Sequence, residues 1–176
     1  MFTVLLTGPP GVGKTSVLTA LVDALTDDDV PHAAIELETL AWTHPALNDK
    51  LWLGYIKTTC DLYRAAGHHL LLVAETLETD EDRTRLLDAV AAEGSFLVRL
   101  EAQPATLVER IIEREPETWS GLADLAEHTQ ELAVSMPALC AVDLVLSTEG
   151  QRPEDVARRI RAALPDRLGA PASSGR

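Results

Sequence analysis

The chain has 176 residues, of which 46% are hydrophobic and 24% are charged, and it contains two cysteines. This composition is typical of one soluble globular domain, large enough to form a core without disulfides or a structural metal. The formal net charge of −13 argues against a nucleic-acid partner, because most of the surface would repel a phosphate backbone.

The two cysteines and the ends of the chain indicate the cellular compartment in which the protein is expected to work. Cys60 and Cys140 are far apart in the sequence and lack metal-ligand spacing, which favours reduced thiols in a cytoplasmic protein. The apolar N-terminus has no basic region before it and is soon interrupted by glycine and two prolines, so we expect neither a signal peptide nor a membrane span. Residues 165–176 are small and polar and are predicted to form a disordered tail, which leaves one domain over residues 1–164.

Strand and helix patterns alternate along that domain. Short apolar runs predict strands, and apolar residues at helical spacing predict helices. The expected strands cover residues 2–7, 32–37, 69–75, 95–101 and 142–147. The expected helices cover residues 14–25, 48–66, 79–93, a stretch from 104 to about 114, 122–134 and 153–164.

Several helix ends carry local signals. Asn48 is a plausible N-cap, and Gly67 is a plausible stop for the same helix. Thr79 and Asp82 have the spacing of a capping box. Pro104 and Pro153 each suit the first position of a helix, where proline loses no hydrogen bond.

Repeated strand-then-helix units of this length predict an α/β fold with a parallel sheet, because parallel strands need crossover connections. Ligands of such sheets bind at the carboxyl ends of the strands. The most informative segment of this sequence lies at that position, directly after the first strand.

That segment fits the pattern G-x-x-x-x-G-K-[ST] and binds phosphate in its usual structural setting, between a strand and a helix. Its glycines allow backbone N–H groups to surround an anion, and the following helix adds its positive dipole end. Lys14 is expected to reach the terminal phosphates of ATP, and the Thr15 hydroxyl is expected to ligate Mg²⁺. The expected nucleotide-binding residues are Gly8, Pro9, Pro10, Gly11, Val12, Gly13, Lys14, Thr15 and Ser16.

The motif and the chain length resemble the P-loop NTPase superfamily and, within it, the small-molecule and nucleotide kinases. The resemblance implies a three-layer fold with strand order 2-3-1-4-5, in which the third strand lies beside the first and ends in an acidic residue. Glu75 takes that place here, instead of the usual aspartate. The resemblance therefore implies that Glu75 helps to hold Mg²⁺ through water or polarises the attacking group; the alternative is a surface glutamate after a core strand.

Two further acids lie where the second strand ends. Side chains alternate along a strand, so Glu36 and Glu38 are expected on the same side of an extended segment. Similar kinases that phosphorylate hydroxyl groups, such as chloramphenicol phosphotransferase, carry an acid in a comparable setting. The resemblance gives Glu38 the role of accepting the hydroxyl proton, with Glu36 as the second candidate. Either glutamate is alternatively a solvated residue at the strand edge.

Arg110 and Arg114 are four residues apart and share one helix face. They precede a polar break, where similar kinases carry arginines at the start of a lid, and there they neutralise charge on the transferring phosphoryl group. Of the two, we favour Arg114 over Arg110 as the residue that neutralises this charge. Neighbouring glutamates leave a second interpretation open, that of a charged helix face in solvent.

The acceptor is expected to bind against residues 36–66. The basic residues of this stretch are Lys50, Lys57 and Arg64; its acids are Glu36, Glu38, Asp49 and Asp61, and its aromatic residues include Trp42, Trp52 and Tyr55. Such a lining offers little to a doubly charged phosphate. It suits a neutral or cationic compound with a hydroxyl group, such as an antibiotic, a sugar or a nucleoside.

The sequence thus predicts an ATP- and Mg²⁺-dependent kinase of a small molecule. A P-loop ATPase or GTPase acting as a switch, a regulatory nucleotide-binding module and a nucleoside monophosphate kinase are the alternatives. The chain has no N-K-x-D guanine motif and no L-S-G-G-Q signature. The acceptor, the choice among Glu36, Glu38 and Glu75 as base, and the oligomeric state stay open.

Overall fold

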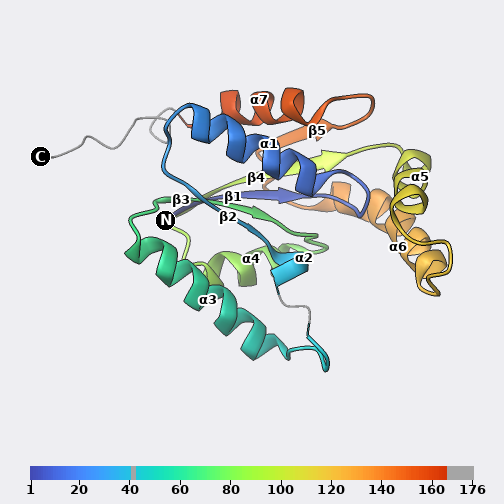
Figure 1. Ribbon diagram of the computed structural model, residues 1–176, viewed down its shortest axis with the longest axis horizontal. Helices are drawn as coiled ribbons and strands as arrows, with labels where there is room; N and C mark the ends of the chain where they lie inside the picture. Colours follow the sequence, from blue (N-terminus) through green and yellow to red (C-terminus); the bar gives the residue numbers. More distant parts are fainter. Residues whose placement is uncertain (41–42, 166–176) are drawn as a thin grey trace, which may run out of the picture.

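The computed structural model has a five-stranded sheet between two layers of helices (Figure 1). It describes residues 1–40 and 43–165. The strands are β1 (Phe2–Thr7), β2 (Ala33–Glu36), β3 (Leu70–Ala74), β4 (Gly94–Glu101) and β5 (Leu144–Ser147). The helices are α1 (Lys14–Asp27), α2 (Leu37–Leu40), α3 (Asp49–Ala65), α4 (Asp80–Ala89), α5 (Pro104–Arg114), α6 (Leu122–Ser135) and α7 (Pro153–Ala163), and Met136–Ala138 forms a 3₁₀ turn, η1.

All strand pairs are parallel, and the strand order is β2-β3-β1-β4-β5, which confirms the predicted α/β fold and topology. β1 lies in the middle, where Leu5 pairs with Val73 of β3 and with Leu97 of β4. Every residue of β3 is buried, as expected of an apolar strand that is covered on both faces.

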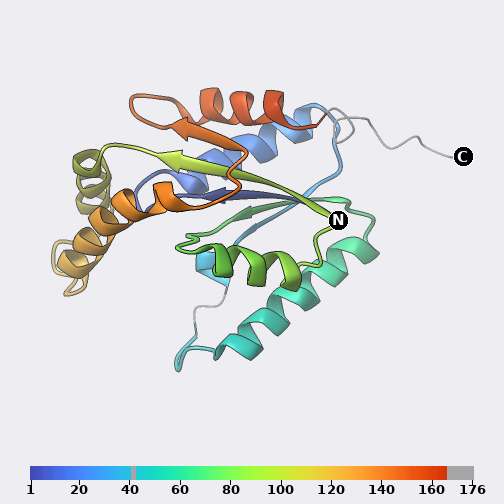
Figure 2. The same ribbon diagram turned by 180° about the vertical axis from the view of Figure 1, so that it is seen from behind.

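The two faces of the sheet carry separate hydrophobic cores. α1 and α7 cover one face, whereas α3 and α4 cover the other (Figures 1 and 2). Val4 packs with Leu21 of α1 and Ile160 of α7 in the first core. The next residue of β1, Leu5, belongs to the second core with Ile56 of α3. α5 and α6 lie side by side beyond the carboxyl ends of the strands, at the right of Figure 1.

The helix-end predictions agree with the structure. The Asn48 side chain accepts a hydrogen bond from the Leu51 N–H, and Gly67 has a φ of 91° directly after α3. Thr79 and Asp82 form the reciprocal capping box. Pro104 and Pro153 open α5 and α7.

Two predictions about element boundaries are wrong. The segment after β2 is not extended: pairing with β3 ends at Glu36, and Leu37–Leu40 turns into the short helix α2 with Leu37 buried. Glu38 therefore lies on a helix, and its relation to Glu36 is not that of alternating strand residues. α4 ends at Ala89 rather than at residue 93, because Ala91 has a φ of 45° and the chain turns there toward β4.

Within the described ranges, none of the helices combines the length and apolar character needed to cross a membrane. Of the predicted tail, residues 166–176 lie outside the described residues, so that assignment stays a prediction.

Candidate active site

The loop between β1 and α1 forms the floor of the site. Val12 N–H donates to the Pro9 carbonyl at 3.2 Å, which closes a turn, and Gly13 caps the helix that begins at Lys14. Gly11 has a φ of 76°, and a Cβ there would lie 2.6 Å from the Leu107 carbonyl oxygen of α5. Glycine is therefore required at position 11 both by its backbone conformation and by the close approach of α5.

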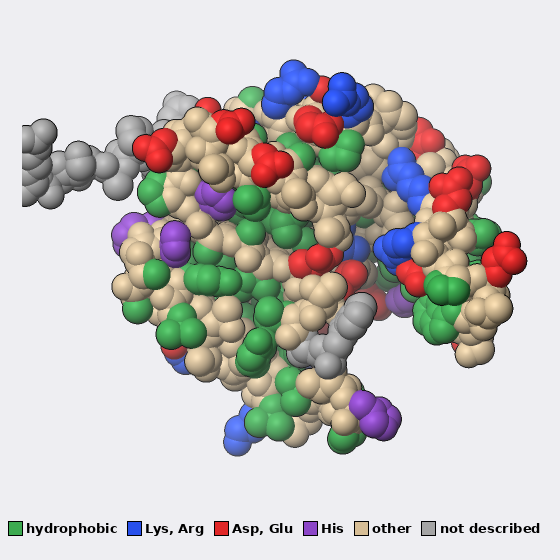
Figure 3. Space-filling view, viewed as in Figure 1, with side chains coloured by type: hydrophobic (Ala, Val, Ile, Leu, Met, Phe, Trp, Pro, Cys, Tyr) green, Lys and Arg blue, Asp and Glu red, His purple; other side chains and the backbone are tan. Residues whose placement is uncertain are grey.

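This loop opens into a pocket of about 430 Å³. Its walls come from the loop, α1, α2, α5, the segment after β5 and the start of α7. Its lining residues are Pro10, Gly11, Val12, Gly13, Lys14, Thr15, Ser16, Val17, Glu38, Arg110, Arg114, Thr148, Gln151, Pro153 and Val156. Acidic and basic side chains meet around the hollow between the α5–α6 edge and the rest of the molecule (Figure 3). Exposed N–H groups at the start of a helix, together with lysine and arginine, are the donors that bind phosphate groups.

Lys14 is the centre of the polar network although its side chain is only 7% exposed. Its Nζ donates to the Gly8 carbonyl at 3.0 Å and to Thr76 Oγ1 at 2.8 Å. The same nitrogen lies 3.0 Å from Glu38 Oε1. The ammonium group is thus held at the mouth of the loop by three oxygens from different parts of the chain.

Glu38 is an ionised partner in this network. Burial alone would raise the pKa of its carboxyl, but the charge of Lys14 and the hydrogen bonds from Thr76 and Lys14 outweigh that effect and lower the pKa below its ordinary value. Thr76 Oγ1 donates to Glu38 Oε1 at 2.6 Å. Glu38 therefore carries its negative charge at neutral pH.

Thr15 and Glu36 form a second contact at the same edge. The Thr15 hydroxyl donates to Glu36 Oε1, so a hydroxyl and a carboxylate oxygen converge beside the phosphate-binding loop. Oxygen ligands of this kind fit Mg²⁺, which takes few protein ligands and keeps several waters. Across the two described ranges, no three His, Cys, Asp or Glu side chains gather as a metal cage would.

Glu75 faces another cavity, of about 220 Å³, between α3, α4 and the end of β3. Its Oε1 accepts a hydrogen bond of 2.9 Å from the Thr76 N–H. Burial, reinforced by the charges of Glu38 and Asp82, raises the pKa of Glu75 to about 7, although the Thr76 N–H and Lys14 act in the opposite direction. The cavity is lined by Asp49, Trp52, Leu53, Glu75, Thr76, Leu77, Asp82, Arg85 and Leu86.

Thr76 joins the two cavities, and the sequence reasoning missed it. Its side chain lines the smaller cavity and contacts Lys14 and Glu38, which line the larger one. No motif marks this threonine. The available signal was its place two residues after β3, the strand beside β1, at the carboxyl edge of the sheet.

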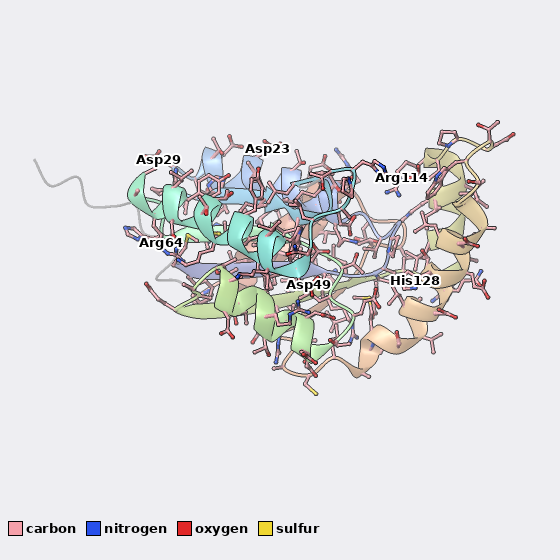
Figure 4. The ribbon with its side chains drawn as sticks, turned by 90° about the horizontal axis from the view of Figure 1, so that it is seen from below. Asp23, Asp29, Asp49, Arg64, Arg114 and His128 are labelled. Carbon is pink, nitrogen blue, oxygen red and sulfur yellow. The ribbon has the colours of Figure 1, made fainter. Side chains whose placement is uncertain are left out.

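The two predicted arginines both line the larger pocket but are held differently. Arg110 donates to the Gly11 carbonyl at 3.3 Å, to Thr148 Oγ1 at 3.1 Å and to the Thr148 carbonyl at 3.1 Å. Arg114, at the end of α5 (Figure 4), is 59% exposed and pairs with the adjacent Glu115 at 2.7 Å. Thr148 is a further lining residue that the sequence did not single out.

The stretch predicted to surround the acceptor contributes only part of the smaller cavity. Trp52 and Asp49 line it, whereas Tyr55 is 46% exposed and is not part of its lining. Lys57 and Arg64 both pair with Asp61 on the exposed side of α3. Trp42 lies outside the described residues.

The basic residue of the smaller cavity comes from α4 instead. Arg85 donates to Asp49 at 2.8 Å, and Asp49 lies at the start of α3 (Figure 4). This pair neutralises one of the cavity's three acids, so the remaining formal charge of the lining comes from Glu75 and Asp82.

Known proteins resemble this chain in sequence pattern and in fold. A family model described as an AAA domain matches residues 4–135, more than half of the chain. A comparison with curated proteins finds no match.

Among solved structures, a gluconokinase from Sinorhizobium meliloti 1021 is 22% identical with a TM-score of 0.64, and the similarity covers 95% of this chain and 93% of that one. A sugar kinase from Janibacter sp. HTCC2649 is 18% identical with a TM-score of 0.67, covering 100% of this chain and 99% of that one. A tunicamycin resistance protein from Deinococcus radiodurans is 19% identical with a TM-score of 0.60, covering 91% and 93%. These similarities show that the chain has the fold of P-loop small-molecule kinases.

Proposed function

This chain belongs to the AAA-domain family, and we propose that it is an ATP- and Mg²⁺-dependent phosphotransferase. It moves the γ-phosphoryl group of ATP to a hydroxyl group of a small molecule. The free thiols of Cys60 and Cys140 support the further proposal that it works in the cytoplasm.

The observation that carries this proposal is the contact between Lys14, which lines one cavity, and Thr76, which lines another. Lys14 lines the pocket of about 430 Å³, and its partner Thr76 lines the cavity of about 220 Å³. A phosphoryl group held by Lys14 would therefore face a second bound molecule. A protein that only hydrolyses or senses a nucleotide has no need of this second cavity.

The larger pocket supplies the groups that phosphoryl transfer requires. The loop N–H groups and Lys14 hold the phosphates, and Arg110 and Arg114 approach from α5 to offset charge on the transferring group. Thr148, Gln151 and Pro153 also line the pocket, and we propose that the nucleoside part of ATP lies against them.

Bound Mg²⁺ would neutralise charge on the β- and γ-phosphates. Thr15 is the proposed protein ligand. Of the two carboxylates considered for this site, Glu36 is supported better than Glu75, because it contacts the Thr15 hydroxyl whereas Glu75 faces the smaller cavity.

The lining of the smaller cavity supports a hydroxyl acceptor over a nucleoside monophosphate. Its single arginine, Arg85, is already paired with Asp49. A phosphate entering beside Glu75 and Asp82 would be poorly compensated for its desolvation. A neutral or cationic molecule would meet Trp52 and carboxylates instead.

ADP formation with defined acceptors tests this function. The assay compares gluconate, shikimate, uridine and glycerol with AMP, CMP, UMP, GMP and dTMP, and mass spectrometry identifies the phosphorylated product. We expect acceptor-dependent ADP formation with an alcohol. Efficient turnover of a monophosphate would assign the protein to the nucleotide kinases, and ADP formation that no acceptor stimulates would assign it to the ATPases.

A pair of lysine variants checks that turnover comes from this site. Lys14→Ala removes one pre-organised donor to the phosphoryl group and is expected to lower turnover by at least about a hundredfold. Lys57→Ala removes an exposed lysine of α3 that pairs with Asp61 and is expected to leave turnover unchanged. Equal activity of both variants with native circular dichroism would contradict phosphotransfer at this loop.

A further inference from the structure

Two glutamates lie close enough to the Lys14–Thr76 contact to act on an acceptor hydroxyl, and they occupy different cavities. Glu38 lines the nucleotide pocket, whereas Glu75 lines the smaller cavity. Family resemblance favours an acid in the position of Glu38 as the base. The placement of the two side chains favours the other one.

The carboxylate of Glu38 already contacts Thr76 and Lys14. Its Oε1 receives the Thr76 hydroxyl at 2.6 Å and lies 3.0 Å from Lys14 Nζ. These contacts stabilise the carboxylate and so lower its affinity for a proton. A general base needs that affinity, because it must accept a proton.

The geometry points to Glu75 as the group that accepts the proton of the acceptor hydroxyl, with Glu38 acting as the counter-ion of Lys14. This inference rests on the proposed phosphotransferase function. Glu75 is oriented by the Thr76 N–H at 2.9 Å, and it lies in the wall of the cavity that would hold the acceptor, next to the threonine that contacts Lys14.

The step balances without any further reactant. The acceptor oxygen forms a bond to the γ-phosphorus as its O–H bond breaks, and the proton passes to the Glu75 carboxylate. The bond from the γ-phosphorus to the bridging oxygen breaks, and its electron pair leaves with ADP. Glu75 then releases the proton to solvent.

The surroundings of Glu75 suit this exchange. The charged groups around it are Lys14 on α1, Glu38 on α2, Asp49 on α3, and Asp82 and Arg85 on α4. Burial with Glu38 and Asp82 raises its pKa to about 7. A base with a pKa near the working pH is both largely ionised and able to take a proton.

The test is the pH dependence of kcat/KM between about pH 5.5 and 8.5, measured with whichever of gluconate, shikimate, uridine and glycerol the wild type phosphorylates fastest. The wild type should show a rising limb centred near pH 7. Glu75→Gln should lose this limb and about 10²- to 10⁴-fold in kcat, whereas Glu75→Asp should regain part of both. Glu38→Gln should keep the limb but move it to lower pH, because the charge of Glu38 contributes to the raised pKa of Glu75.

Glu78→Gln is the matched control. It makes the same chemical change three residues further along, on an exposed side chain that contacts His128, and should leave the profile unchanged. Titration of ATP itself would appear in every variant, so only a limb that disappears selectively reports on Glu75.

The outcomes separate the two proposals. A limb that persists in Glu75→Gln, or that disappears in Glu38→Gln, overturns the assignment of Glu75 while the phosphotransferase function stands. A wild type that phosphorylates no alcohol overturns the function, and this inference with it. Carboxyl ¹³C NMR gives a readout independent of activity: Glu75 should titrate near neutral pH, and titration of Glu75 at its ordinary pKa of 4.5 would contradict the proposal.

Discussion

The ammonium group of Lys14 lies 3.0 Å from a carboxylate oxygen of Glu38, so the lysine that would hold the terminal phosphate already has an anionic partner. Phosphate and carboxylate compete for one cation. The site therefore binds nucleotide against the attraction between two of its own side chains.

Replacing Glu38 with Gln tests this competition. The variant removes the competing negative charge and keeps a similar shape, so AMPPNP without Mg²⁺ should bind about three- to tenfold more tightly, consistent with a partly exposed ion pair worth about 1 kcal/mol. Isothermal titration calorimetry at low ionic strength measures the change. Unchanged or weaker binding would show that Glu38 does not oppose the phosphates.

Glu75 makes the stability of the fold depend on pH. Its pKa is about 7 in the folded protein against an ordinary value of 4.5, so the unfolded chain loses this proton first. Stability is therefore lost as the pH rises from about 4.5 through 7, and it is fully present only below that interval. Glu75→Gln removes the effect and should raise the free energy of unfolding by about 2 kcal/mol more at pH 8.5 than at pH 5.5.

Urea denaturation of the wild type and of Glu75→Gln at both pH values measures this difference. Glu78→Gln again serves as the control, because its exposed side chain should give the same small change at both pH values. An equal gain for Glu75→Gln at pH 5.5 and 8.5 would mean that Glu75 is not the titrating group.

Alanine substitutions at Gly11 and Gly13 separate the cost of backbone strain from the cost of steric crowding. Both have positive φ, 76° and 93°, but a Cβ on Gly11 would lie 2.6 Å from the Leu107 carbonyl, whereas one on Gly13 would have nothing within 4 Å. Gly13→Ala should cost about 1–2 kcal/mol of stability from its backbone alone. Gly11→Ala should cost a further 1–3 kcal/mol, because α5 must move; equal melting temperatures would contradict the close contact.

Nucleotide should order one part of the α5–α6 region selectively. Residues 115–121 connect α5 to α6 and contain no helix. Kinases exclude water by closing such a segment over the bound nucleotide. Hydrogen exchange there should slow when AMPPNP and Mg²⁺ are added. Residues 104–111, whose Leu107 and Ile111 are fully buried, should change little; uniform behaviour of both segments would argue against a lid.

Much of the fold was predictable because it depends on short-range sequence patterns. The apolar run at β3, the Asn48 cap and the Thr79–Asp82 box each act within a few residues, and all three form as expected. Helix α2 was not predictable, because a helix of four residues is too short to show a periodic pattern.

The sequence pointed to the loop of the site and also to Glu38, Arg110 and Arg114, which line the same pocket. The phosphate-binding motif has its expected setting between β1 and α1. The role of Glu75 and the contacts of Thr76, which the sequence did not predict, depend on the path of the chain after β3. There the Leu77 N–H donates to the Thr7 hydroxyl at 2.9 Å. That contact joins residues 70 positions apart, and no sequence pattern near Glu75 reports it.

The contact between Gly11 and α5 also decides which part of α5 is fixed to the loop. The Leu107 carbonyl packs against Gly11, and Arg110 donates to the Gly11 carbonyl. The first turns of α5 are therefore fixed to the phosphate-binding loop. We expect any bending of this region to begin near Glu115, where the backbone becomes extended. The two arginines of the helix thus differ in what holds them, because Arg110 is bonded to the phosphate-binding loop, whereas Arg114 is 59% exposed and pairs with the adjacent Glu115.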